Sequence, residues 1–254
     1  MLRPFLSYYG GKWRAAKSYP EPRYSTIVEP FAGGAGYSLR YPDRDVILVE
    51  KNPKVAAIWR YLISADPDRI RSLPDIGPEG VDAHGLPDAE RWLIGFWLNG
   101  GSASPCKTPS KWAMSARSQL FWGERVRERI VSQVGSIRHW QILEGDFTDA
   151  PDTEATWFVD PPYQVAGKHY PCRMSDADFV RLAPWCRSRR GQVIVCENAG
   201  ADWLPFQPHR RIKATSKNGA RWSDEVVWLS DEQHREIHAK NTEEKSMNRG
   251  DDEA

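Results

Sequence analysis

Residues 26–36 read TIVEPFAGGAG, an apolar run that leads directly into three glycines. The run itself, residues 26–31, is short and rich in β-branched side chains, as buried strands are. Glycine has no Cβ and tolerates positive φ, so glycines placed after a strand let the backbone approach a nucleotide-like ligand. The segment therefore predicts a strand that ends in a ligand-binding loop.

A second apolar run, residues 46–50, ends in Glu50, seventeen positions after Gly33. A carboxylate at the end of the next strand can accept hydrogen bonds from both ribose hydroxyls of an adenosine cofactor. Glycines and one acid fit a dinucleotide, a nucleoside cofactor or a plain tight turn, so these two signals do not by themselves choose a function.

Short apolar runs and helical patterns alternate along most of the chain. Further strands are predicted at residues 140–143, 155–159, 192–196 and 225–229, and helices at residues 53–64, 88–99, 124–134 and 175–189. Asn52 before Pro53, and Ser175 three residues before Asp178, are helix-start signals. Strands that alternate with helices form a parallel sheet with both faces covered, so we expect an α/β fold.

Two segments depart from this alternation. Residues 73–139 begin with a proline- and glycine-rich linker and hold a tryptophan-rich helical pattern, so we expect a small, mainly helical inserted region there. Residues 231–254 have no aromatic residue and a net charge of −4, which predicts a charged, disordered tail. The first 230 residues therefore carry +5, and the excess lies mainly in residues 101–140 and 187–221. A polyanion can dock on such basic segments.

Composition excludes several classes of protein. With 254 residues, 40% of them hydrophobic, the chain can bury a sizeable core without disulfides. Its four cysteines form no Cys-x-x-Cys pair and no cluster with histidines, so we expect no metal site and a reducing compartment. Neither a transmembrane stretch of about 18 apolar residues nor a signal peptide is found. We therefore expect a cytoplasmic protein that binds no membrane, with a monomer favoured.

The most specific signal is the turn Asp160-Pro161-Pro162-Tyr163, which ends the apolar run 155–159. Proline has a fixed φ and no N–H, so this turn presents carbonyl oxygens beside the Asp160 carboxylate. The exocyclic amine of a nucleobase is a weak nucleophile, because its lone pair is delocalised into the ring. Hydrogen bonds from its protons to a carboxylate and a carbonyl help to localise that pair on nitrogen, and Tyr163 can stack on the base. A base reaches such a turn only by leaving the duplex, at a cost of about a few kcal/mol.

Taken in order along the chain, these motifs resemble those of DNA adenine-N6 methyltransferases of the Dam-like class, which use S-adenosylmethionine. The resemblance covers most of residues 5–230 and rests on Tyr8-Tyr-Gly-Gly-Lys12, the loop 29–36, Glu50 with the following Asn52-Pro53, and residues 160–163. It implies a Rossmann-like sheet of seven strands, the last two near residues 211–216 and 225–229. It also implies a methyltransferase domain of residues 1–72 and 140–230, with target recognition in the inserted region 73–139.

Site residues follow from the same match. The resemblance implies cofactor binding by Tyr8, Lys12, Phe31, Gly33, Gly36, Glu50, Asp146, Phe147 and Asp160, and catalysis by Asp160, Pro161, Pro162 and Tyr163. The glycine loop departs from the family pattern Phe-x-Gly-x-Gly, because Ala35 stands at its fifth position. The match therefore leaves open which glycine makes the closest approach to the cofactor.

Basic residues surround Trp112 and Trp122 in the inserted region. Such residues position a protein on phosphates without reading the base sequence. We expect DNA contacts from among Lys107, Lys111, Arg117, Arg125 and Arg129. Arg125 and Arg129 are four residues apart and should share a helix face, opposite the apolar stripe of Val126, Ile130 and Val134.

The sequence thus predicts an enzyme that transfers a methyl group from S-adenosylmethionine to N6 of a flipped-out adenine in double-stranded DNA, as an orphan methylase or beside a restriction enzyme. The same chemistry on cytosine N4, an RNA adenine or a protein amide is an alternative, although Asp at position 160 favours adenine. A catalytically decayed DNA-binding module is a second alternative. A dinucleotide-dependent oxidoreductase explains the glycines and Glu50 but leaves the 160–163 turn without a role.

Overall fold

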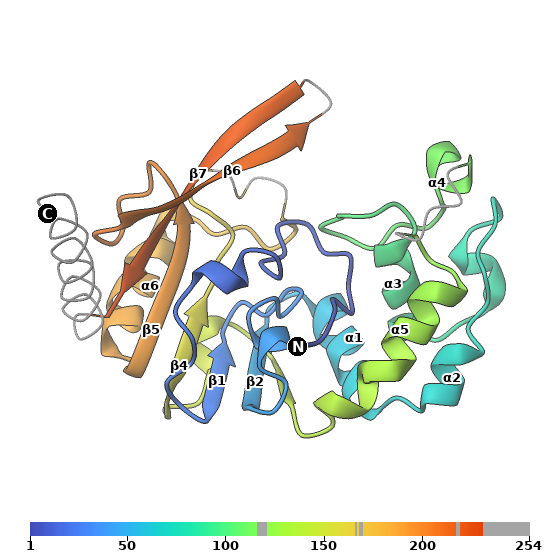
Figure 1. Cartoon of the computed structure of the whole chain (residues 1–254), viewed down its shortest axis with the longest axis horizontal. Helices are drawn as coiled ribbons and strands as arrows, with labels where there is room; N and C mark the ends of the chain where they lie inside the picture. Colours follow the sequence, from blue (N-terminus) through green and yellow to red (C-terminus); the bar gives the residue numbers. More distant parts are fainter. Residues whose placement is uncertain (116–120, 166, 168–169, 217–218, 231–254) are drawn as a thin grey trace, which may run out of the picture.

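A mixed sheet of seven strands forms the centre of this computed structural model, which describes residues 1–115, 121–165, 167, 170–216 and 219–230 (Figure 1). The strands are β1 Thr26–Glu29, β2 Asp45–Glu50, β3 Gln141–Glu144, β4 Glu154–Val159, β5 Arg190–Asn198, β6 Gln207–Ser216 and β7 Gly219–Leu229. Their order is β3-β2-β1-β4-β5-β7-β6, and β1 to β5 pair in parallel whereas β7 is antiparallel to β5 and β6. The predicted Rossmann-like sheet of seven strands is confirmed by this order.

The four predicted helices lie close to their predicted positions, whereas α2 and α4 were not predicted. They are α1 Pro53–Ser64, α2 Pro67–Arg71, α3 Asp88–Trp97, α4 Lys111–Ser115, α5 Glu124–Val134 and α6 Asp176–Ser188, with short 3-10 turns between them. The Asn52 side chain accepts a hydrogen bond from Lys54 N, and Ser175 and Asp178 form a capping box, so both predicted helix starts are confirmed. Strand β1 ends two residues earlier than predicted, because Pro30 has no N–H to donate to a neighbouring strand. None of the described helices is long and apolar enough to cross a membrane.

Alternating side chains of the central strands divide the core between the two faces of the sheet. On β1, Ile27 packs with the apolar side of α1, whereas the next residue, Val28, packs with α6. The same alternation separates Phe158 from Trp157 on β4. Because successive side chains of a strand point to opposite faces, both faces are buried and the expected covered parallel sheet results.

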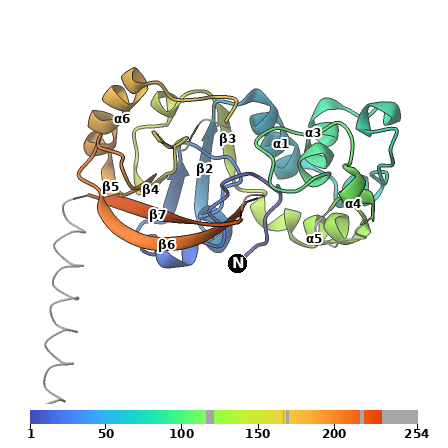
Figure 2. The ribbon, with the colours of Figure 1, turned by 90° about the horizontal axis from the view of Figure 1, so that it is seen from above.

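The inserted region extends the core of the sheet instead of building a separate one. Apolar side chains of α3 and α5 belong to the same cluster as Trp59 of α1, and Trp97 donates from Nε1 to the carbonyl of Phe5 at 2.8 Å. Leu73, Val81, Ile94 and Leu98 form a smaller cluster beneath the loops. Helices α3, α4 and α5 therefore stand beside the sheet, at the end near α1 (Figures 1 and 2).

Two glycines of the 33–36 loop allow close contacts with different parts of the N-terminal segment. A Cβ on Gly33, which has φ +43°, would lie 3.0 Å from the Tyr8 ring. A Cβ on Gly36 would lie 2.5 Å from the backbone nitrogen of Trp13 and 2.8 Å from the carbonyl carbon of Lys12. Gly36 therefore lets the N-terminal segment pass directly over the loop after β1.

Gly36→Ala should lower the free energy of unfolding by about 1–3 kcal/mol, because the added Cβ overlaps backbone atoms that cannot rotate away. Urea denaturation followed by circular dichroism measures this change. Gly135→Ala is the matched control, since a Cβ there meets nothing within 4 Å. The control should change stability by about 0.5 kcal/mol or less, and equal losses in both variants would contradict the close approach at Gly36.

Candidate active site

One pocket lies at the carboxyl edge of the parallel strands, where the loops after β1, β2, β3 and β4 meet the N-terminal segment. It holds about 880 Å³ including the space at its open mouth. The nine residues expected to bind a cofactor all line it: Tyr8, Lys12, Phe31, Gly33, Gly36, Glu50, Asp146, Phe147 and Asp160. Carboxyl ends of parallel strands point to the same edge of a sheet, which is why motifs distant in sequence meet there.

Glu50 fixes the glycine loop from the end of β2. Its carboxylate accepts hydrogen bonds from the backbone nitrogens of Gly33 and Asn52, each at 2.8 Å. Burial raises the pKa of Glu50, and these backbone donors counteract that rise. The carbonyl of Gly33 is in turn held by Trp59 Nε1 at 2.8 Å. Hydrogen bonds within the protein therefore hold Glu50 and the glycine loop together.

Asp146 provides a free acceptor on the other side of the pocket. Lys51 binds one carboxylate oxygen at 2.8 Å, and the other oxygen, Oδ1, is buried with no hydrogen-bond partner among the described residues. Phe147 follows directly and stacks against Phe31, with ring centroids 5.7 Å apart. A buried acceptor beside aromatic rings, with Glu50 across the pocket, fits the amine, the base and the ribose of an adenosine moiety.

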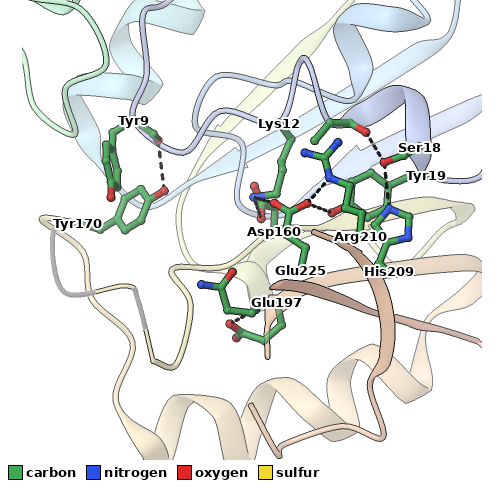
Figure 3. A network of polar contacts seen from close by, with 12 residues as sticks. Tyr9, Lys12, Ser18, Tyr19, Asp160, Tyr170, Glu197, His209, Arg210 and Glu225 are labelled. Carbon is green, nitrogen blue, oxygen red and sulfur yellow. Dashed lines mark hydrogen bonds and ion pairs between the residues drawn. The ribbon is translucent and has the colours of Figure 1, made fainter. Parts of the chain in front are cut away.

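Asp160 lies at the end of β4 in a chain of buried charges (Figure 3). Its Oδ1 is 3.0 Å from Lys12 Nζ, which is also 3.7 Å from Glu225 Oε1. Burial raises the pKa of Asp160, and the Lys12 ammonium opposes that rise. Burial alone would lower the pKa of Lys12, but the carboxylates outweigh it and raise that pKa above its ordinary value.

The four residues of the 160–163 turn are placed differently around the pocket. Asp160 and Pro162 line it, whereas Pro161 is buried beneath it. Tyr163 also lies outside the lining, and its ring packs under Lys12 Nζ, 4.6 Å from the ring centroid. Tyr163 therefore supports the ammonium group in this structure, in addition to any contact with a base.

Three residues of the site were not predicted from sequence. Glu225 of β7 binds Lys12 and also accepts a hydrogen bond from Arg210 Nε at 2.7 Å. Glu197, fully buried at the end of β5, accepts hydrogen bonds from Gln164 N and Trp203 Nε1, which anchors the chain directly after the turn. The sequence did contain a signal for Glu197 and Glu225, because each is an acidic residue at one end of a predicted strand. The third residue, Glu29, is also a strand-end acid and lines the pocket.

Tyr170 covers the mouth of the pocket from the loop after β4. Its hydroxyl donates to the carbonyl of Tyr9 at 3.2 Å (Figure 3). The centroid of its ring lies 6.2 Å from that of the Tyr8 ring. A Cβ on Gly10 would lie 2.1 Å from the Tyr170 hydroxyl oxygen, so the glycine at φ +72° leaves room for this contact. His169, in the same loop, lies outside the described residues.

The predicted DNA contacts of the inserted region are not brought together at the pocket. Lys107 and Lys111 are exposed, and Lys107 forms an ion pair with Asp82 at 3.0 Å. The stripe of Val126, Ile130 and Val134 is buried as predicted, and Arg125 is exposed. Arg117 lies outside the described residues, as does the predicted tail 231–254.

Arg129 differs from the expectation that it shares a solvent face with Arg125. Its guanidinium lies 4.6 Å from the centroid of the Trp97 ring, and its Nε and Nη2 atoms are buried without a described partner. Burial lowers the pKa of Arg129. The cause is α3, which packs Trp97 against this side of α5 and covers a face that helix periodicity alone leaves open.

Comparison with known proteins gives only distant similarities. No protein-family model matches the chain, and no curated protein matches it. Among solved structures, the glycopeptide N-methyltransferase MtfA with S-adenosylmethionine is 13% identical over 94% of this chain and 80% of its own, with a TM-score of 0.36. The rRNA methyltransferase aviRa from Streptomyces viridochromogenes is 19% identical over 84% and 80%, with a TM-score of 0.36. A conserved hypothetical protein from Streptococcus pyogenes is 13% identical over 81% and 86%, with a TM-score of 0.35. At these values the similarities carry no argument about activity.

Glu29 should make stability depend on pH. Burial raises its pKa from 4.5 to about 8, against hydrogen bonds from Ser38. Between these values the folded chain keeps the proton that the unfolded chain releases, so the free energy of unfolding falls by about 1.4 kcal/mol per pH unit. The contribution is fully present below pH 4.5 and fully lost above about pH 8.

Glu29→Gln should remove this decline while keeping the acceptor for Ser38 N, which lies 2.7 Å from Glu29 Oε1. Urea denaturation at several pH values across the window measures it. The exposed Glu154→Gln is the control and should keep the decline. An unchanged slope in Glu29→Gln would show that this carboxyl group is ionised in the folded chain.

Proposed function

We propose that this chain is an S-adenosylmethionine-dependent methyltransferase that acts on N6 of adenine in double-stranded DNA. One observation carries the proposal: a single pocket is lined both by Glu50, with its loop, and by Asp160 of the strand-end turn. Glu50 could accept hydrogen bonds from ribose hydroxyls there, and Asp160 could accept one from an amine. A dinucleotide-dependent oxidoreductase would explain Glu50. It would not explain why Asp160 lines the same pocket and is paired with Lys12.

The residues of the pocket suit the proposed cofactor. Glu50 would accept hydrogen bonds from the ribose hydroxyls, and the unpaired Asp146 Oδ1 would accept one from the adenine amine of the cofactor. Phe31 and Phe147 would contact its base. When bound, S-adenosylmethionine supplies a methyl group activated by a sulfonium sulfur.

Asp160 and the carbonyl of Pro161 would orient the target amine. A carboxylate that accepts an N–H proton localises the nitrogen lone pair toward the methyl group. The amine nitrogen would form a bond to the methyl carbon while the bond between that carbon and the sulfonium sulfur breaks, which leaves S-adenosylhomocysteine. One proton of the amine would then pass to solvent, so no strong general base is needed. Lys12 favours the ionised form of Asp160, which accepts hydrogen bonds, and the Tyr163 ring packs against the Lys12 ammonium group. Lys12 is therefore a positioning residue.

Asp160→Ala should reduce methylation by at least about 100-fold, the loss typical for removal of one positioned electrostatic group. The assay incubates the protein with unmethylated duplex DNA and S-adenosylmethionine, digests the DNA to nucleosides and identifies methylated species by mass spectrometry. Asp152→Ala, an exposed acid before β4, is the control and should keep full activity. N6-methyldeoxyadenosine from the unmutated chain supports the proposal, and full activity of Asp160→Ala would contradict the mechanism. Methylation of RNA or protein instead of DNA would contradict the substrate.

Lys12→Gln should move the acidic limb of the pH–rate profile to higher pH. The Lys12 ammonium lowers the pKa of Asp160 against the effect of burial, so its loss raises that pKa further and more base is needed to ionise the acceptor. Lys17→Gln, an exposed neighbour, should leave the profile unchanged. A Lys12→Gln enzyme that is slower at every pH by the same factor would show that Lys12 does not act through the ionisation of Asp160.

A further inference from the structure

Helix α5 holds the backbone of Arg3 in a fixed place. The Gln133 side chain accepts a hydrogen bond from the backbone nitrogen of Arg3 at 2.9 Å and donates one to its carbonyl at 2.7 Å. Gln133 is only 8% exposed, so water competes little for these bonds. Arg129 lies four residues before Gln133 and shares its helix face. The N-terminal segment is thereby fixed beside Arg129, and Figures 1 and 2 show the amino-terminal end of the chain near α5.

Two guanidinium groups come together at this place. The Arg129 guanidinium lies 4.6 Å from the centroid of the Trp97 ring, and the exposed Arg3 guanidinium lies 5.2 Å from that of Trp13. Burial lowers the pKa of Arg129, and the nearby Arg3 cation lowers it further. Among the described residues, no acid forms an ion pair with either group, and Arg129 Nε and Nη2 are buried without a hydrogen-bond partner.

Neighbouring charges on α5 are arranged differently, because Arg127 forms an ion pair with Asp75, and Glu128 forms one with Arg71. Two adjacent cations repel each other, and a buried N–H without an acceptor lowers stability. An oxyanion between the two groups would remove the repulsion and supply the acceptors. The planar guanidinium group matches two oxygens of a phosphate, so phosphate is the anion that suits this pair best.

The chain that carries Arg3 leads directly to the pocket. The carbonyl of Phe5 accepts a hydrogen bond from Trp97 Nε1, and the Tyr8 ring, which lines the pocket, lies 5.5 Å from the centroid of the Phe96 ring. Five residues of extended chain span at most about 18 Å. Each strand of duplex DNA presents one phosphate for about every 3.4 Å of helix axis. A phosphate a few base pairs from a base in the pocket would therefore be within reach of the pair.

We propose that Arg3 and Arg129 together bind one backbone phosphate of the duplex DNA whose target base enters the pocket. The inference rests on the proposed function. Arg129 supplies a guanidinium group held against Trp97, and Arg3 supplies a second one from the segment that also carries Tyr8 and Lys12. The contact joins the inserted region to the N-terminal segment, and it positions the duplex without reading its sequence.

Salt dependence of DNA binding tests the pair. The double variant Arg3→Gln, Arg129→Gln removes both charges. Fluorescence anisotropy with an unmethylated duplex gives the slope of log K against log salt, which should fall in magnitude by about 0.9 because one phosphate contact is lost. The control variant Arg44→Gln, Arg190→Gln removes two exposed charges from the amino edge of the sheet and should keep the slope.

Arg3→Glu is a second variant that does not remove the buried cation. Its backbone can keep both bonds to Gln133, while the new carboxylate would pair with Arg129 and exclude the phosphate. The slope should again fall by at least about 0.9. Binding of S-adenosylmethionine and the thermal midpoint show whether each variant is folded. An unchanged slope in the folded variants overturns the inference, and so does a loss of slope with duplex RNA but not with DNA.

Free phosphate is a second source of the same chemistry. The thermal midpoint in sodium phosphate is compared with that in sodium chloride of equal ionic strength. A rise specific to phosphate that the double variant abolishes, together with an unchanged DNA slope, would assign the pair to free phosphate and overturn the DNA contact. A reduced slope on a protein that methylates no DNA would support the phosphate contact and reject the proposed function, so the two failures are distinguishable.

Discussion

The ion pair between Lys12 and Asp160 is the interaction on which the site depends. It joins the N-terminal segment to the end of β4, and Glu225 extends it to β7. Removing charges from water is costly, and a buried pair is tolerated only when its partners satisfy one another. Loss of Lys12 would leave Asp160 without its counter-ion, whereas Glu225 would keep its ion pair with Arg210. The same ammonium group thus joins the N-terminal segment to the sheet and favours the ionised form of Asp160.

The pocket exists because four parallel strands end at one edge. Each strand delivers one part of the site: the glycine loop from β1, Glu50 from β2, Asp146 from the chain after β3 and Asp160 from β4. The N-terminal segment covers these ends, and Gly36 is the residue that allows its backbone to come near enough. The site is therefore assembled across the width of the sheet, and the inserted region flanks it without contributing to its acidic centre.

Sequence patterns predicted most of the strands, four of the helices and the nine cofactor residues that line the pocket. Helix starts at Asn52 and Ser175 depend on side chains that bind the backbone within three residues, and local chemistry of this kind can be read from a single segment. Arg129 shows the limit of such local patterns. Helix periodicity predicts on which side of α5 the Arg129 side chain lies. Only the tertiary structure shows that Trp97 of α3 packs on that side and covers the guanidinium group.

By itself the sequence determined the α/β class, the strand ends and the set of acids, glycines and prolines that share one edge, because spacing along a strand or helix sets these features. The tertiary structure alone decided the partners of each charge. Lys12, Asp160 and Glu225 are distant in the sequence and meet only because the strand order places β4, β5 and β7 side by side. Burial and pairing depend on which elements lie side by side, and no local pattern contains that information.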